Sequence, residues 1–181
     1  EEAAMPMKTL SEAMGLRNAL LSNLERSITC DTTQERRELL NVVIVGGGAT
    51  GVEIAGAIAE MKRYILPKDY PEIDHSDLHI FLIEAGNRLL SGMSVKSSRK
   101  AEEFLRRMGV NIYLNKKVTD FVAHKVILED GMEIPTQTFI WVSGVRANEI
   151  GNLSSEAIGH GGRILVDAYN QIKGMNHVFC I

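Results

Sequence analysis

The sequence predicts an α/β fold in which a parallel sheet with crossover helices carries a small antiparallel β-meander. Two observations favour the parallel sheet. The apolar, β-branched segments at 42–45, 78–83 and 110–114 have the composition of strands buried on both faces. Helical patterns separate them, so the chain reads as two linked strand–helix–strand units with a right-handed crossover. After residue 114 the strands become short, and Asp130-Gly131 is a hairpin signal that predicts the meander.

The N-terminal third is expected to hold one helix, one connector and the first strand. Apolar residues recur at spacings of three, four or seven across 9–28, which indicates an amphipathic helix. Thr9 followed by Glu12 predicts a capping box at its start. The polar residues 29–38 are interpreted as a connector, and 39–45 as the first buried strand.

The elements after this strand follow from the same reasoning. A helical pattern starts at Ala49 and is expected to last until Pro67. The later segments are expected as a polar loop at 68–77, a strand at 78–83, a helix at 95–108 and strands at 110–114, 118–122, 125–128, 132–134 and 139–142. The buried face of the 95–108 helix is expected to comprise Val95, Ala101, Phe104, Leu105 and Met108. Gly109 is placed to close that helix in the left-handed conformation.

Composition excludes several classes of protein. The formal net charge is −3 and no basic stripe stands out, so no electrostatic footprint for nucleic acid is present. No apolar run approaches the roughly 18 residues of a membrane span. Cys30 and Cys180 are far apart and lack a Cys-x-x-Cys pattern, which makes a reduced, cytoplasmic setting the expectation. The five dispersed histidines show no metal-ligand spacing, so no metal site is predicted.

The main chemical motif is the run Gly46-Gly47-Gly48-Ala49-Thr50-Gly51, which follows a buried strand and opens a helix. In this context Gly-x-Gly-x-x-Gly is typical of a Rossmann-like dinucleotide site. Gly46 is expected to allow the tight turn, Gly48 to let a pyrophosphate approach the backbone, and Gly51 to let the helix lie close to the sheet. Ala55 and Gly56 are expected to assist that close packing. The pyrophosphate would lie at the helix N-terminus, where N–H groups and the helix dipole favour an anion.

Acidic and small residues at two strand ends extend this predicted site. Glu84, followed by Ala85, ends the second strand, where a carboxylate bonds the adenosine ribose hydroxyls. Its charge disfavours a 2′-phosphate, so NAD(H) is expected over NADP(H), although Arg88 nearby weakens that preference. Ser143-Gly144 follows the last buried strand at its carboxyl end, where ligands bind in open α/β sheets. Trp141, just before them, is expected in the core.

The segment Val42–Glu53 resembles the NADH-domain signature of the pyridine nucleotide–disulfide oxidoreductase superfamily, and type II NADH dehydrogenases most of all. Further matching stretches cover nearly the whole chain: Ala4–Leu10, Ile83–Ala85, Phe139–Asn148 and Gly162–Asp167. The resemblance implies an NADH:quinone oxidoreductase with FAD as its second cofactor. It also implies that Glu53 lies near the nicotinamide–flavin junction as a catalytic residue. Without the resemblance, Glu53 reads as an acid in the first turn of a helix, favoured by the dipole.

The resemblance further implies that the chain is part of a longer protein. Members of the family have two dinucleotide folds, and only one glycine fingerprint occurs here. We therefore expect residues 1–38 to be a helical and connector segment that belongs to an FAD domain and flanks the NAD(H)-binding domain at 39–150. Residues 151–181 are expected to begin the return into the FAD domain. The full-length parent would reach quinone, and the cytoplasmic face of the membrane, through regions outside this sequence. The resemblance is also compatible with a homodimeric parent.

Three alternatives to this function remain at the level of sequence. The first is another flavoenzyme of the superfamily, a ferredoxin or disulfide reductase, although a Cys-x-x-Cys of the thioredoxin-reductase kind is absent. The second is a non-catalytic nucleotide-binding module, which the isolated chain would resemble because it supplies no redox centre. A stand-alone dehydrogenase is the weakest alternative, because no substrate domain with an acid–base group follows the fold.

Overall fold

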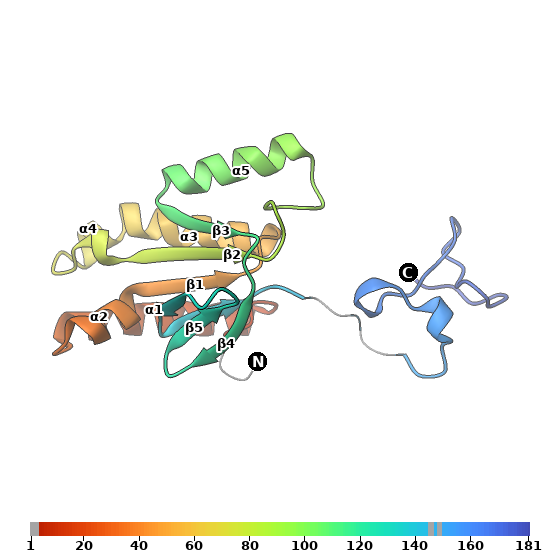
Figure 1. Cartoon of the computed structure of the whole chain (residues 1–181), viewed down its shortest axis with the longest axis horizontal. Helices are drawn as coiled ribbons and strands as arrows, with labels where there is room; N and C mark the ends of the chain where they lie inside the picture. The colour runs from red at the N-terminus through yellow and green to blue at the C-terminus, as the bar shows by residue number, and fades with distance from the viewer. Residues whose placement is uncertain (1–3, 145–146, 148–149) are drawn as a thin grey trace. The chain divides into compact units, whose positions relative to one another are not determined.

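The computed structural model describes residues 4–144, 147 and 150–181, and the chain divides into two compact units, Glu1–Ser143 and Gly144–Ile181 (Figure 1). The first unit contains both β-sheets and the long helices. It therefore includes the range 1–38 together with most of 39–150. The assignment of those ranges to domains of a longer parent stays a prediction.

The larger sheet has four parallel strands in the order β3-β2-β1-β7, as the alternation of strands and helices predicts. The strands are β1 (Asn41–Val45), β2 (His79–Glu84), β3 (Val110–Leu114) and β7 (Thr138–Trp141). At the centre of the sheet, Ile44 pairs with Leu82 on one side and Ile140 on the other. All three side chains are fully buried, which explains why these strands read as continuous apolar runs.

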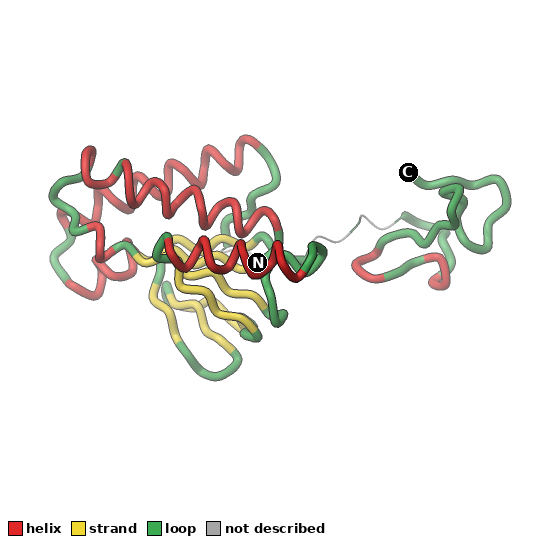
Figure 2. The backbone as a smooth tube through the Cα atoms, turned by 90° about the horizontal axis from the view of Figure 1, so that it is seen from above, coloured by secondary structure: helices red, strands yellow, loops and turns green. Residues whose placement is uncertain are grey.

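The two faces of this sheet are covered differently. Alternate residues such as Val42 and Ile44 pack with helices α1 (Leu10–Thr29), α3 (Ala49–Tyr64) and α5 (Val95–Arg107). Val43 and Val45 point to the other face and pack against the smaller sheet. Figure 2 shows the long helices gathered on one side and the smaller sheet on the other. The result is a helix layer, a parallel sheet and a meander layer, with a core on each side of the sheet.

The smaller sheet is an antiparallel meander of β4 (Val118–Val122), β5 (Lys125–Leu128) and β6 (Glu133–Pro135), in that order. Its first turn is Ala123-His124, and both residues have positive φ, of 50° and 60°. Non-glycine residues rarely adopt this conformation, so the sequence carries no clear signal for this turn. The second turn contains Gly131 with φ 83°, which confirms the Asp130-Gly131 hairpin signal.

The N-terminal residues close one edge of the parallel sheet. Met5 forms a parallel bridge with Ile140, because its N–H donates to the Phe139 carbonyl at 2.7 Å and its carbonyl accepts from Trp141 N–H at 3.0 Å. An open strand edge is a template for unwanted pairing. Met5 therefore covers the outer side of β7 as a one-residue extension of the sheet.

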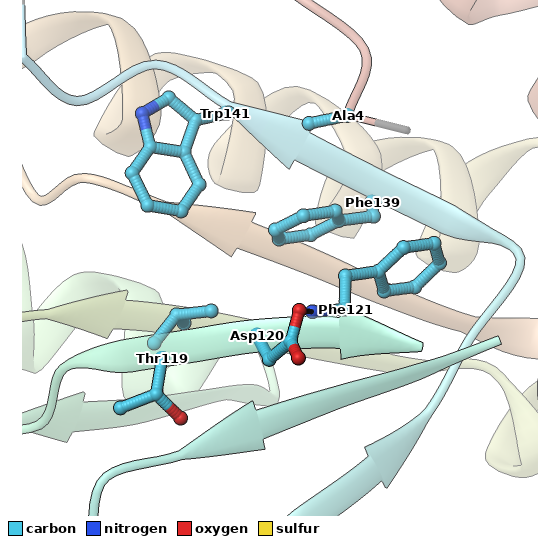
Figure 3. A pocket seen from close by; sticks show the side chains of 7 residues that line it. Ala4, Thr119, Asp120, Phe121, Phe139 and Trp141 are labelled. Carbon is cyan, nitrogen blue, oxygen red and sulfur yellow. Dashed lines mark hydrogen bonds between the residues drawn. The ribbon is translucent and has the colours of Figure 1, made fainter. Parts of the chain in front are cut away.

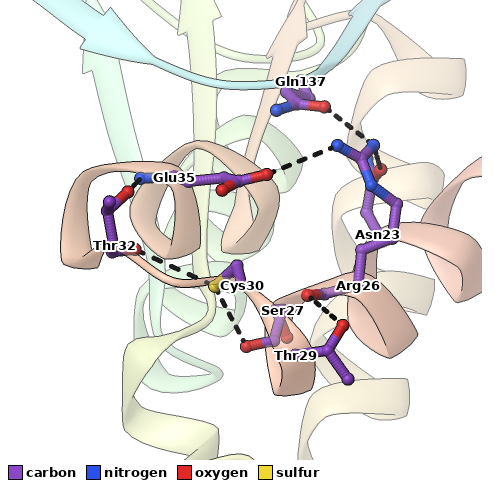
Figure 4. Close-up of polar contacts among 8 residues, drawn as sticks. All are labelled: Asn23, Arg26, Ser27, Thr29, Cys30, Thr32, Glu35 and Gln137. Carbon is purple, nitrogen blue, oxygen red and sulfur yellow. Dashed lines mark hydrogen bonds and ion pairs between the residues drawn. The ribbon is translucent and has the colours of Figure 1, made fainter.

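The predicted connector at 29–38 is wrong, because it contains most of helix α2 (Thr33–Leu40). The Thr32 side chain accepts a hydrogen bond from Glu35 N–H at 3.1 Å and starts this helix. Figure 4 shows this turn beside α1, with Arg26 reaching Glu35 and Gln137. Leu39 and Leu40, expected to start the first strand, instead end α2 and are buried there. The Thr-x-x-Glu spacing at 32–35 was the signal for this helix.

Two further sequence predictions are corrected by the packing of helices. α3 ends at Tyr64, and Pro67 lies in the first turn of a short helix α4 (Leu66–Asp69), a position that proline favours. On α5, Leu105 is buried, whereas Val95 is 72% and Phe104 is 56% exposed. Phe104 instead lies under the Arg107 guanidinium, whose carbon is 4.4 Å from the ring centroid. Gly109, with φ 85°, closes the helix as predicted.

The second unit consists of two single-turn helices, Ser155–Ala157 and His160–Gly162, and isolated bridges. The bridges pair Ile158 with Ile164, Val166 with Ile172, and Gln171 with Phe179. Ala157 and Ile172 are its buried apolar residues in the part of the chain that the structure describes. Across that same part of both units, no helix has the length and apolar character needed to cross a bilayer.

The capping box of α1 predicts a pH-dependent stability. Glu12 accepts hydrogen bonds from Lys8 N–H at 2.6 Å and Thr9 N–H at 2.8 Å, and these bonds lower the pKa of Glu12 below its ordinary 4.5. The folded protein therefore gains stability from Glu12 above pH 4.5 and loses it as the pH falls through the lowered pKa. Urea unfolding at about pH 6 and about pH 3.5 should show a smaller loss for Glu12→Gln than for wild type. Glu25→Gln, in the interior of the same helix, should lose as much as wild type, and equal losses in all three proteins would contradict the prediction.

Candidate dinucleotide-binding site

The glycine turn connects the carboxyl end of β1 to the start of α3. Gly46 has φ 118°, and its N–H donates to the Ile83 carbonyl on β2 at 2.9 Å. A Cβ atom on Gly46 would lie 2.9 Å from the backbone nitrogen of Ser143, just after β7. The turn is therefore pressed between the ends of β2 and β7, and only glycine combines this φ with this contact.

The other glycines differ in how tightly they are enclosed. A Cβ atom on Gly51 would lie 1.9 Å from the Gly46 carbonyl oxygen, and one on Gly47 would lie 2.7 Å from Leu89. Gly48 has open space around it, and α3 starts there without a side-chain cap. The uncapped helix N-terminus leaves backbone N–H groups available to an anion. The expected role of Gly56 is wrong, because it faces Leu105 of α5 at an ordinary 3.9 Å and not the sheet.

Glu84 ties the turn to the end of β2. One carboxylate oxygen accepts from Gly47 N–H at 2.5 Å, and the other accepts from Gly86 N–H at 2.6 Å. A carboxylate has about four lone-pair sites, so each oxygen keeps capacity for one more donor. The carboxylate thus orders the glycine turn and retains acceptor capacity for a further donor, and the sequence did not indicate the first of these two properties.

A pocket of about 200 Å³ opens at this edge of the sheet. Its lining combines the turn with all three neighbouring strand ends and the start of β4: Val45, Gly46, Ile83, Glu84, Ala85, Lys116, Lys117, Val118, Trp141 and Ser143. The structure therefore brings together the predicted residues Gly46, Glu84, Ala85 and Ser143. Carboxyl ends of parallel strands are the expected ligand-binding edge of such a sheet.

Lys116 and Lys117 are pocket residues that the sequence reasoning missed. They follow β3 and form one wall of this pocket, which Glu84 also lines. The Lys116 ammonium pairs with the Asp130 carboxylate, and this hydrogen bond raises the pKa of Lys116 and lowers the pKa of Asp130. The lysine pair was visible in the sequence, but only the position of β3 beside β2 places it at the pocket.

A second pocket of about 200 Å³ lies next to the first and shares Val118 and Trp141 with it. Figure 3 shows its aromatic lining, in which Phe121 of β4 stacks on Phe139 of β7 with ring centroids 4.8 Å apart. Trp141 meets Phe139 edge-on at 6.0 Å and donates from its indole N–H to the Ser143 carbonyl at 2.9 Å. Trp141 is therefore half-buried beside both pockets and not in the core, which corrects the prediction.

The remaining predicted site residues lie on exposed surface. Ala49, Thr50 and Glu53 are exposed on α3, and Glu53 lies in its second turn, so the expectation of a first-turn acid is wrong. Gly144 is exposed with φ 77° and is the first residue of the second unit. In the described ranges, no group of histidine, cysteine and acidic side chains is arranged to hold a metal ion.

The parallel sheet, the crossover helices and the glycine turn at the carboxyl edge define a Rossmann-like α/β protein with a meander. Residues 6–181 match the family model described as pyridine nucleotide-disulphide oxidoreductase. The chain belongs to this family, which confirms the superfamily resemblance inferred from the motifs.

Individual relatives agree with the resemblance to type II NADH dehydrogenases. A probable NADH dehydrogenase of Dictyostelium discoideum is 32% identical over 99% of this chain and 40% of its own length. The type II NADH:quinone oxidoreductase NdhA of Mycobacterium tuberculosis is 32% identical over 97% of this chain and 39% of its own. Among solved structures, that of NDH2 from Plasmodium falciparum in complex with NADH aligns with a TM-score of 0.75 and 26% identity, over 80% of this chain and 31% of that one. The chain thus spans about two fifths of the length of the curated relatives.

Proposed function

We propose that this chain is the NADH-binding part of an FAD-dependent NADH:quinone oxidoreductase and positions NADH for hydride transfer to the flavin. The observation that carries the proposal is the Glu84-ordered glycine turn at the mouth of the carboxyl-edge pocket. The named relatives support an NADH:quinone oxidoreductase as the parent. In such a parent, quinone binding, membrane contact on the cytoplasmic face and any dimerisation would involve further regions.

The residues of the site suit two chemical groups of a dinucleotide, its pyrophosphate and its ribose hydroxyls. Close approach to a pyrophosphate needs backbone without side chains, and Gly48 with its uncapped helix N-terminus supplies it. The ribose hydroxyls need acceptors, and Glu84 has lone pairs left after bonding Gly47 and Gly86. We propose that Ala85 and Ser143 border the cofactor at the strand ends, with Gly144 and Glu53 towards the nicotinamide. The hydride chemistry belongs to NADH and flavin, and the residues of this chain bind and orient.

The proposal predicts that the chain alone binds NADH. Calorimetric titration should show saturable heat, and amide NMR signals of the turn at 46–51, Glu84 and Ser143 should shift, because the turn and pocket are already formed. Signals of α2, which does not line the pocket, serve as the internal control. No heat and no shift at the turn would contradict the proposal.

A second experiment tests the role in electron transfer. The longer protein should purify with flavin absorbance, and NADH should bleach it. Glu53→Gln in that protein is expected to slow flavin reduction or its reoxidation by quinone while NADH affinity changes less than about threefold, because Glu53 does not line the carboxyl-edge pocket. Activity with disulfide substrates in place of quinone would assign the parent to another branch of the family.

A further inference from the structure

The 115–118 segment, which carries the pocket-lining residues Lys116 and Lys117, is held by hydrogen bonds from two directions. Asn115 N–H donates to the Gly86 carbonyl at 2.9 Å, and Lys116 N–H donates to the Glu84 carbonyl at 3.1 Å. On the other side, Glu129 N–H donates to the Lys117 carbonyl at 2.9 Å. The wall is therefore bonded both to the loop that carries Glu84 and to the β5–β6 hairpin. The backbone places two ammonium side chains and one carboxylate around a single pocket.

The β5–β6 hairpin supplies the carboxylate that pairs with one of the two lysines of this wall. Asp130 pairs with Lys116, and its second oxygen accepts from Met132 N–H at 3.3 Å, so the acid is held by its own turn. Lys117 is exposed and has no ion pair within the described part of the chain. Glu84, Lys116 and Lys117 line the pocket, while Asp130 pairs with Lys116 and the charge of Glu129 also acts on Lys116. Without Asp130, Lys116 would lose its ion-pair partner and the site would become more positive by one unit of charge.

We propose that the Lys116–Asp130 pair is a specificity-determining element that works with Glu84 to favour NADH over NADPH, an inference that rests on the proposed NADH site. A 2′-hydroxyl needs only an acceptor, which Glu84 provides. A 2′-phosphate is repelled by Glu84 and needs cations, and two lysines stand in the same pocket. Asp130 forms an ion pair with Lys116, so the pocket presents less positive charge to a 2′-phosphate than two unpaired lysines would.

The test uses two positional isomers with two phosphate groups each, ADP and 2′,5′-ADP, titrated calorimetrically into the whole chain. Asp130→Asn keeps the acceptor oxygen for Met132 N–H and removes the charge. We expect it to raise the affinity for 2′,5′-ADP about threefold to fivefold and that for ADP less than about twofold, as for one exposed ion pair. The double variant Asp130→Asn with Lys116→Gln should return the ratio of affinities to the wild-type value, and added salt should shrink the gain.

The matched control is Glu133→Gln, which breaks the Lys125–Glu133 pair in the same meander but outside the pocket. It should leave the ratio of the two affinities at the wild-type value. A ratio unchanged in Asp130→Asn, or shifted equally by Glu133→Gln, would overturn the inference while leaving the proposed function intact. A wild-type chain that binds neither nucleotide would reject both, because the site itself would then be absent.

Discussion

Gly51→Ala is expected to unfold at a lower urea concentration than wild type, with a loss of roughly 3 kcal/mol or more in the free energy of unfolding. The added methyl group would lie 1.9 Å from the Gly46 carbonyl oxygen. The Cβ atom and the carbonyl oxygen are both attached directly to the backbone, so neither can rotate away. The glycine turn or the first turn of α3 must therefore move until the two atoms reach a normal van der Waals separation. Because this displacement deforms the turn, NADH affinity is expected to fall at least about tenfold.

The matched control for this substitution is Gly56→Ala on the same helix. The nearest atom to its new methyl group is a Leu105 methyl carbon at 3.9 Å, an ordinary contact. Alanine has the higher helix propensity, by up to about 1 kcal/mol, so this variant should be as stable as wild type or more so. Urea unfolding and NADH titration of both variants check the prediction. Equal stability of the two variants would show that the turn tolerates a side chain at residue 51.

Glu84→Gln is expected to have the second largest effect. A glutamine offers one acceptor oxygen, so either Gly47 N–H or Gly86 N–H faces an NH₂ group in place of an acceptor. The Gly47 bond is partly buried and the Gly86 bond is exposed, so loss of the Gly47 bond is the costly case, at about 1 to 3 kcal/mol for an unsatisfied N–H. The turn should therefore lose order, and NADH affinity should fall about tenfold or more.

The effect of Glu84→Gln on NADPH separates two roles of the carboxylate. Removing the negative charge relieves repulsion of a 2′-phosphate, so the affinity for NADPH should fall by a smaller factor than that for NADH. Glu60→Gln removes an exposed charge from α3 and should change neither affinity. Equal losses for NADH and NADPH would mean that Glu84 acts through the turn alone.

Local patterns were sufficient for several parts of the fold. The Thr9–Glu12 box predicted the start of α1, and the apolar runs and the glycine fingerprint predicted β1 and the turn into α3. In each case the signal is a pattern of residue types within a short stretch of chain. The same reasoning failed at Leu39 and Leu40, because two buried leucines suit the end of a helix as well as the start of a strand.

The charge environment of the candidate site was not readable in this way. Glu84 is 37 residues from the Gly47 amide that it accepts from, and Lys116 is 14 residues from Asp130. Phe104 looked like a core residue by type, yet it is exposed on α5 and lies under the Arg107 guanidinium. Such features depend on which side chains meet across elements, and spacing along the chain does not specify that.

Apolar strand segments and the glycine fingerprint were enough to predict the layered α/β class and the turn, because residue composition and motif spacing can be read along the chain. The sequence also predicted that Glu84 would end β2. The folded structure was needed to show that Glu84 orders the turn and that Lys116 and Lys117 line the same pocket as Glu84. The parallel pairing of β1 with β2 brings Glu84 to Gly47. The pairing of β3 with β2, with the hydrogen bonds of the 115–118 segment to two separate loops, brings the two lysines to the pocket.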